Sequence, residues 1–231
     1  EEQSTGDFSI GLGYSSLDET SVTLGINERN FLGTGRRASA SISTSGTETN
    51  FNLGLTEPYL LGRNLTGSFD VFNTKNKSDE TTINQTGFSL GVGFSAARDV
   101  FHRLNYELSQ SKTTVSSTTA TSITGEAGKT RLRSSLKYVL SKDTRDSRFD
   151  PTEGYLLEMD ETFSGFGGDV KFLRTQLSAA YYKPLLFKSV ILGVSGKLGY
   201  VTGLGDKVTQ SQRFNLGGRD VRGFGSGGIG P

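Results

Sequence analysis

Apolar residues alternate with small or polar residues along most of this chain. The period of two is clearest at residues 8–14, 88–95, 132–140 and 190–200. Such alternation gives a β-strand one apolar face and one polar face. No helical period interrupts these runs. The chain is therefore predicted to be an all-β protein built from many two-faced strands.

Turn-forming clusters of Gly, Asn, Asp, Ser and Pro separate the alternating runs and divide the chain into eleven predicted strands. These strands lie near residues 7–14, 19–29, 35–45, 48–56, 64–74, 82–96, 99–111, 129–141, 154–164, 169–183 and 188–202. Long polar connections are expected after the fifth, seventh and eleventh strands, and shorter ones after most even-numbered strands. The long connection after the eighth strand is the exception.

Two architectures accommodate such strands, a soluble β-sandwich and a transmembrane β-barrel with a polar lumen. Several predicted strands reach the roughly 9 to 11 residues that cross a bilayer, whereas sandwich strands cluster near about 5 or 6. The polar faces also carry charges that suit a watery lumen, namely Arg131, Arg133, Lys137, Glu158, Asp160 and Lys197. We therefore favour an antiparallel transmembrane β-barrel, with the sandwich as the alternative. Bacterial single-chain barrels have even strand numbers, so eleven strands indicate an incomplete barrel that continues beyond Pro231.

Composition excludes several classes of protein. A net charge of +1 gives no electrostatic footprint for nucleic acid. The 31 Gly residues could suggest disorder, but 15 Phe and 8 Tyr fall within the alternating runs. The absence of Cys excludes disulfides and thiolate metal sites. No apolar stretch has the roughly 18 to 20 residues of a membrane helix. Glu1 opens the sequence without a Met or a leader, so a processed or excised piece is expected.

No catalytic, cofactor or metal site is predicted, and we do not expect an enzyme. Gly223, Gly225 and Gly228 match a dinucleotide-binding fingerprint, but no helix or parallel sheet follows them. His102 is the only histidine, and we expect an ordinary surface or turn residue near the start of the seventh strand. The acidic residues of 143–154 are interleaved with arginines and lack calcium-loop spacing, so a charged, solvated turn is expected.

The glycine-rich segment that ends the chain contains Arg222 beside apolar neighbours. If the segment folds into the lumen, these neighbours can pack while the guanidinium pairs with lumen carboxylates. The alternative is a mobile external loop.

Val221, Arg222, Gly223 and Phe224 resemble the sixth-loop signature of the bacterial surface-antigen barrel family, which includes outer-membrane protein assembly factors. Residues 30–35 resemble the turn after the second strand of that family, and residues 143–154 resemble the turn after the eighth. The resemblance covers essentially the whole chain. Family barrels have sixteen strands, and the signature loop follows the eleventh. The resemblance thus implies that residues 1–231 are the N-terminal part of an outer-membrane barrel ending in the sixth external loop (203–231), without the POTRA domains and the last five strands.

The resemblance also implies a function, the assembly and insertion of β-barrel proteins into the bacterial outer membrane without any cofactor. The implied partners are outer-membrane lipid, nascent β-barrel clients and assembly lipoproteins, but no nucleic acid. The acidic partners of Arg222 would lie on the missing strands. A two-partner-secretion transporter of the same superfamily, a passive porin and a soluble binding module are the alternatives.

In this family the first strand forms one side of a lateral gate, to which a client strand adds by edge pairing. The corresponding residues here are Phe8, Ser9, Ile10, Gly11, Leu12, Gly13 and Tyr14. The glycines pack poorly and should weaken the seam with a closing strand. Alternatively, they only relieve crowding on the lumen face.

Overall fold

A computed structural model describes residues 5–15, 19–77, 81–115, 128–185, 190–205, 208 and 212–214. They form eleven β-strands and one short 3-10 helix, η1 (Leu60–Gly62). The strands are β1 (Gly6–Ser15), β2 (Glu19–Phe31), β3 (Arg36–Thr44), β4 (Glu48–Glu57), β5 (Thr66–Lys77), β6 (Thr81–Ala97), β7 (Val100–Val115), β8 (Thr130–Asp143), β9 (Gly154–Gly168), β10 (Phe172–Leu185) and β11 (Val190–Gly203). All eleven predicted strands are confirmed. Within the described ranges, no helix has the length and apolar character needed to cross a membrane.

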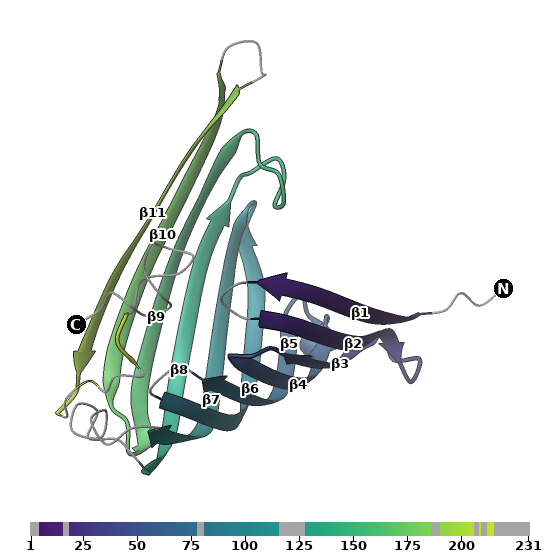
Figure 1. Ribbon diagram of the computed structural model, residues 1–231. Coiled ribbons are helices and arrows are strands. Elements are labelled where there is room, and N and C mark those ends of the chain that lie inside the picture. The colour runs from purple at the N-terminus through teal and green to yellow at the C-terminus, as the bar shows by residue number, and fades with distance from the viewer. Residues whose placement is uncertain are drawn as a thin grey trace.

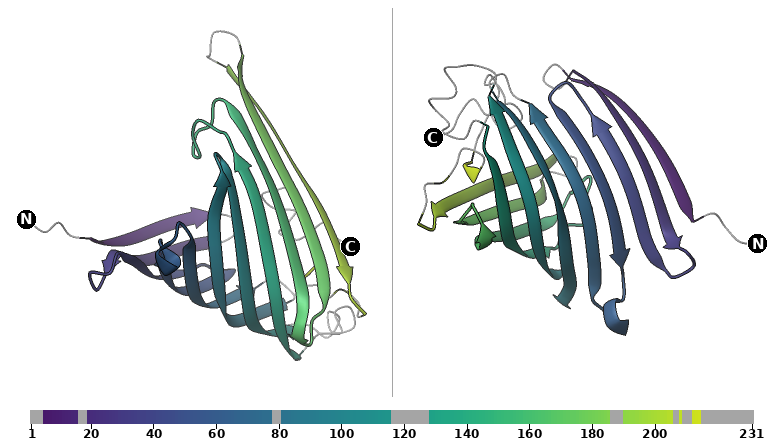
Figure 2. Two further views of the ribbon diagram at one scale, coloured as in Figure 1. Left: turned by 180° about the vertical axis from the view of Figure 1, so that it is seen from behind. Right: turned by 90° about the horizontal axis from the view of Figure 1, so that it is seen from below.

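The strands form one antiparallel sheet in sequence order, from β1 at one edge to β11 at the other. Figures 1 and 2 show that the sheet twists and curls into an open trough, so that β1 and β2 run at a large angle to β10 and β11. Among the described residues, neither β1 nor β11 pairs with a second strand. The predicted fold class, an incomplete antiparallel barrel of eleven strands, is confirmed.

The apolar face of the sheet points outward and is uncovered. Cross-strand pairing aligns the apolar positions, as in the row formed by Leu140, Met159, Leu177 and Leu198 on β8–β11. Leu198 is 73% exposed and Leu12 on β1 is 79% exposed. A sandwich would cover this face with a second sheet. The described part has a single sheet, so the sandwich alternative is wrong and the outward face suits lipid.

The opposite face is polar, as predicted for a lumen. The six charged side chains expected there all lie at positions that face inward in the strand register. Two cross-strand ion pairs join some of them to their neighbours. Arg133 pairs with Glu107, and the Lys137 Nζ lies 3.3 Å from an oxygen of Asp160.

The lengths of the connections differ from the prediction. The connection after β5 comprises only residues 78–80, whereas a long one was predicted there. The connection after the even-numbered strand β4 is longer, at residues 58–65, and the long connection predicted after β8 is confirmed, at residues 144–153. The long connection predicted after β7 is confirmed, at residues 116–129.

The error lies where β5 continues past its predicted end, with residues 75–77 paired to β6. The polar bonds that start this extension come just before it. The Asn73 amide donates to Asn84 Oδ1 at 3.1 Å and to Thr86 Oγ1 at 2.6 Å. These outward-facing polar side chains form cross-strand bonds that extend the ladder. Because the outward face is polar there, the alternation that marks a strand disappears while the strand continues.

Candidate functional site

The first candidate site is the free edge of β1. β1 pairs with β2 alone, from Gly6 opposite Glu28 to Ser15 opposite Glu19. In an antiparallel strand, alternate residues direct their N–H and C=O groups to opposite sides, so about half of the ten residues of β1 present both groups to the free edge. Such an edge is a template for another strand.

The side chains of β1 divide between two environments. Phe8, Ile10, Leu12 and Tyr14 lie on the outward face, and Ser9, Gly11 and Gly13 lie on the lumen face. All seven predicted client-pairing residues are exposed. The structure thus brings them together along one open edge.

Packing does not require glycine at position 11. A Cβ there would lie 3.5 Å from the Cβ of Thr23, an ordinary contact. At Gly13 a Cβ would come within 2.7 Å of the Ser21 hydroxyl, which can rotate away. Crowding on the lumen face therefore gives no reason for Gly11 and only a weak reason for Gly13.

The second candidate site is the lumen wall of β7–β10. Besides the ion pair between Arg133 and Glu107, Gln85 donates to the same Glu107 oxygen at 3.1 Å. Three buried side-chain atoms have no hydrogen-bond partner in the described part of the chain, namely Asp160 Oδ1, Arg131 Nε and Arg133 Nε. The wall therefore has spare hydrogen-bonding capacity for a polar segment that enters the lumen.

The signature residues Val221, Arg222, Gly223 and Phe224 lie outside the described residues, so their predicted position in the lumen is not tested. The described part of the same loop includes residues 212–214. Phe214 lies on the inward face of β10 and β11, with its ring centroid 4.1 Å from the Arg174 guanidinium carbon and its ring against Gly199. The sequence argument missed this contact. The only signal for it was an aromatic residue in a glycine-rich segment.

The turn between β8 and β9 is organised by the Asp146 carboxylate. It accepts the backbone N–H groups of Thr152 and Glu153 at 2.9 and 3.1 Å, and also the Thr152 hydroxyl. These donors, the Thr152 hydroxyl foremost, hold the pKa of Asp146 well below its usual range. In the described residues no group of three or more potential ligands could hold a metal ion. The arrangement is that of the predicted solvated turn.

Gly154 closes this turn with a φ of +103°. A Cβ at Gly154 would come within 2.4 Å of the carbonyl oxygen of Thr144. Only glycine fits there. In the turn after β2, Asn30 Oδ1 accepts the Gly35 N–H at 2.7 Å. Side-chain acceptors therefore close both turns on which the family resemblance partly rests.

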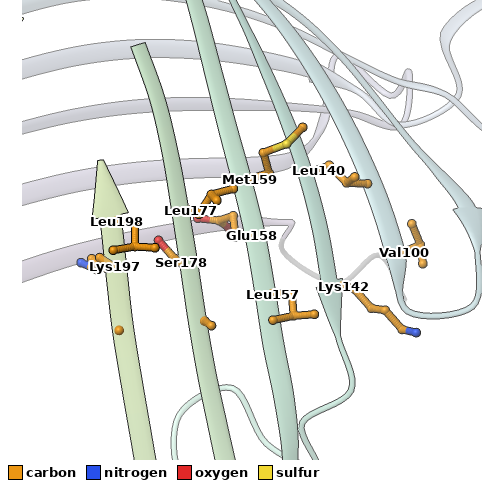
Figure 3. A pocket seen from close by; sticks show the side chains of 12 residues that line it. Val100, Leu140, Lys142, Leu157, Glu158, Met159, Leu177, Ser178, Lys197 and Leu198 are labelled. Atoms are coloured by element: carbon orange, nitrogen blue, oxygen red, sulfur yellow. The ribbon is translucent and has the colours of Figure 1, made fainter. Parts of the chain in front are cut away.

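The outward face carries a shallow apolar groove over β8–β11, with a volume of about 690 Å³. Figure 3 shows Leu140, Leu157, Met159 and Leu177 projecting from neighbouring strands, with Lys142 farther along β8. The lining also includes the small residues Ala179 and Gly196. The groove belongs to the lipid-type face, and its lining is apolar apart from Lys142, Glu158, Ser178 and Lys197.

His102 also lies on the outward face, within β7. Its ring stacks on Phe94 at 5.0 Å between centroids, and its Nδ1 shares a hydrogen bond of 2.7 Å with the Tyr138 hydroxyl. His102 is thus a surface residue near the start of β7, as expected, and its side chain also contacts two neighbouring strands. This trio is typical of the aromatic girdle of a membrane barrel.

Residues 30–231 match the model of the Omp85 superfamily domain. The chain is similar to the outer membrane protein assembly factor BamA of Neorickettsia risticii, with 28% identity over the whole chain and 31% of that protein. It is 31% identical to BamA of Nitratidesulfovibrio vulgaris, again over its whole length and 30% of that protein. It thus spans about a third of the length of these relatives.

The similarity extends to eukaryotic proteins and to a solved structure. The human sorting and assembly machinery component 50 homolog is 27% identical over 98% of the chain and 48% of its own length. The crystal structure of BamA from Haemophilus ducreyi lacking POTRA domains 1–3 superposes with a TM-score of 0.91. That match covers all of this chain and 48% of the other, at 22% identity, and it supports the same fold.

Proposed function

Because the chain belongs to the Omp85 superfamily, we propose that it forms the first eleven strands of a barrel that assembles and inserts β-barrel proteins into the bacterial outer membrane. The chain is an integral outer-membrane segment, in keeping with its uncovered apolar face. The observation that carries the proposal is the similarity of the whole chain to outer-membrane assembly factors, and the first strand of its sheet, β1, has exposed residues from Gly6 to Tyr14. The named activity of the relatives, outer-membrane protein assembly, is the reaction for which such an edge is suited.

The proposed mechanism is templated strand addition. A nascent barrel in lipid must satisfy every backbone N–H and C=O group, since each unsatisfied group costs several kcal/mol there. β1 offers its unpaired groups to the first client strand, so that the client folds while its own edge is paired. The free energy comes from the client, as its strands bury apolar side chains in lipid and close their ladder.

We further propose that this reaction needs no cofactor and no covalent chemistry, so the protein is not an enzyme. Its partners would be outer-membrane lipid, nascent β-barrel clients and the lipoproteins of an assembly complex. Arg222 would sit inside the lumen and pair with carboxylates on later strands of the barrel. The protein would then act by lowering a kinetic barrier to insertion.

Engineered disulfides test strand addition directly, because the chain has no native cysteine. In the full-length protein, Ser9→Cys places a thiol on the lumen face of the free edge. Ser41→Cys is the matched control, because Ser41 lies on the same face but between Gly25 and Asn52 of two paired strands. Each variant is mixed with an unfolded client that carries a single cysteine in its terminal strand.

We expect a disulfide between client and protein during insertion for Ser9→Cys, and none for Ser41→Cys. Equal cross-linking at both positions, or at neither while the client still inserts, would contradict strand addition at β1. A large steady conductance without any cross-link would indicate a passive channel instead.

A further inference from the structure

We propose that Phe214 is an anchor that fixes the base of the signature loop on the lumen wall, in a socket formed by Gly199 of β11 and Arg174 of β10. The three residues come from separate parts of the chain. Gly199 pairs with Gln176, and Arg174 pairs with Val201, so both socket residues face the lumen on neighbouring strands. Phe214 lies beyond the end of β11 and returns to this wall.

The absence of a side chain at Gly199 creates the socket. A Cβ at Gly199 would come within 2.6 to 2.8 Å of three atoms of the Phe214 ring. Real Cβ atoms do not approach so closely, because packed atoms repel steeply below van der Waals contact. The Phe214 ring and even a single methyl group at position 199 therefore cannot occupy this place at the same time.

Arg174 covers the ring from the other strand. Its guanidinium carbon lies 4.1 Å from the ring centroid, well inside the range of a cation–π interaction. Within the described part of the chain, no carboxylate lies within salt-bridge distance of Arg174. In the described residues the Arg174 guanidinium thus contacts the Phe214 ring, and this contact gains strength because Arg174 is half-buried.

Neighbouring residues keep this corner of the lumen closed. Gln212 is buried, and the Arg213 guanidinium donates to the Val208 carbonyl at 3.4 Å within the same loop. Val170 and Phe172, the buried hydrophobic residues of the described chain, lie at the start of β10 near Arg174. Arg174 therefore lies two residues along β10 from the buried side chain of Phe172.

The anchor shortens the free path to the signature. Arg222 is 17 residues beyond Gly205 but only 8 beyond Phe214. Because effective concentration falls roughly as the −3/2 power of tether length, a tether of 8 rather than 17 residues raises the effective concentration of Arg222 for a lumen partner about threefold. Phe214 is thus a positioning residue that acts through the loop, and its effect on client assembly rests on the proposed function.

The test uses the full-length protein in bilayers, with trypsin cleavage after Arg219 and Arg222 as the readout of loop docking. Three variants open the socket in different ways: Phe214→Ala removes the ring, Gly199→Ala fills its place, and Arg174→Gln removes the cation. Gly196→Ala is the matched control, since a Cβ at Gly196 meets nothing within 4 Å. Heat-modifiability verifies that each variant is folded.

We expect each socket variant to raise the cleavage rate by about three- to tenfold, the range of a partly buried cation–π contact with its packing. Arg174→Lys should restore most of the protection because it keeps a cation over the ring. The double variant Gly199→Ala with Phe214→Ala should be cleaved no faster than either single variant, since both substitutions remove the same contact. Unchanged cleavage in Phe214→Ala and Arg174→Gln, or multiplied effects in the double variant, would overturn the anchor.

Client insertion measured on the same samples separates the anchor from the function. If cleavage rises and insertion slows together, the loop base serves assembly. If cleavage rises while insertion is unchanged, the anchor stands and the loop has no part in the proposed function.

Discussion

Stiffening β1 should slow client assembly if its free edge is the place where client strands add. The perturbation is Gly11→Val combined with Gly13→Val, two changes on the lumen face opposite Thr23 and Ser21. The backbone leaves room for a side chain at both positions. The atom nearest to an added Cβ is the Thr23 Cβ at 3.5 Å for Gly11 and the rotatable Ser21 hydroxyl at 2.7 Å for Gly13. The substitutions therefore change the strand's stability without blocking its fold.

The expected magnitude follows from strand propensity and cross-strand pairing. Replacing glycine by a β-branched residue in a strand gains about 1 kcal/mol per site. Two sites give about 2 kcal/mol, which lowers the population of an open seam about thirtyfold, because 1.4 kcal/mol corresponds to a factor of ten. The rate of client insertion should fall by a similar factor if opening of the seam limits it.

The assay follows the appearance of folded, heat-resistant client in liposomes that contain the full-length protein. Gly196→Val serves as control, since Gly196 faces outward on β11 and has open space around its Cα. Amide exchange in β1 reports whether the seam has been tightened. A client insertion rate equal to that of the control, in a variant whose β1 amides are better protected, would refute the reasoning.

Three further predictions concern the loop, the turn after β8 and the outward face. Arg222→Ala in the full-length protein should leave a buried anion unpaired. Equal protease protection and equal heat-modifiability in the variant and the unmodified protein would contradict this. Because the pKa of Asp146 is lowered, its carboxylate stabilises the turn fully above the ordinary Asp pKa of about 4. This stabilisation is lost as the pH falls towards the folded pKa. Amide exchange of the turn should accelerate over that acidic window, and Asp146→Asn should have the same effect at neutral pH, unlike Asp150→Asn. Tyr138→Phe should lower the free energy of unfolding by about 1 to 3 kcal/mol because it leaves the His102 ring without its hydrogen bond. His102→Phe in the same background should recover the loss.

The strands were predictable because lipid on one side and water on the other enforce alternation. All eleven were identified from the sequence, and the inward charges were assigned to the correct face. What failed was the end of β5, where Lys75, Asn76 and Lys77 pair with β6 beyond the apolar band. There, both faces of the sheet carry polar side chains, so the periodicity disappears while the hydrogen-bonded ladder continues.

The free edge of β1 was predictable in part, and the Phe214 socket was not. The edge position follows from strand order, since the first strand of a meander pairs with the second alone until a last strand closes the barrel. The socket depends on the return of the chain after β11 to a particular point of the wall. Nothing in the sequence distinguishes Gly199 from the other inward glycines, because only the approach of the ring requires it.

The lumen face has two kinds of wall, and their difference matches the proposed mechanism. Around β1–β3 many inward positions are small, among them Ser9, Gly11, Gly25 and Ser41. The cross-strand ion pair between Arg29 and Asp7, at 2.6 Å, is solvent-exposed and stabilises the β1–β2 pair only slightly. Around β7–β10 the inward face carries cross-strand ion pairs and the base of the signature loop. A barrel that must part at one seam needs weak side-chain coupling there and firm coupling where its internal loop is held. The proposed client-pairing edge and the loop base therefore lie at opposite ends of this sheet, an arrangement in which the edge can open without releasing the loop base.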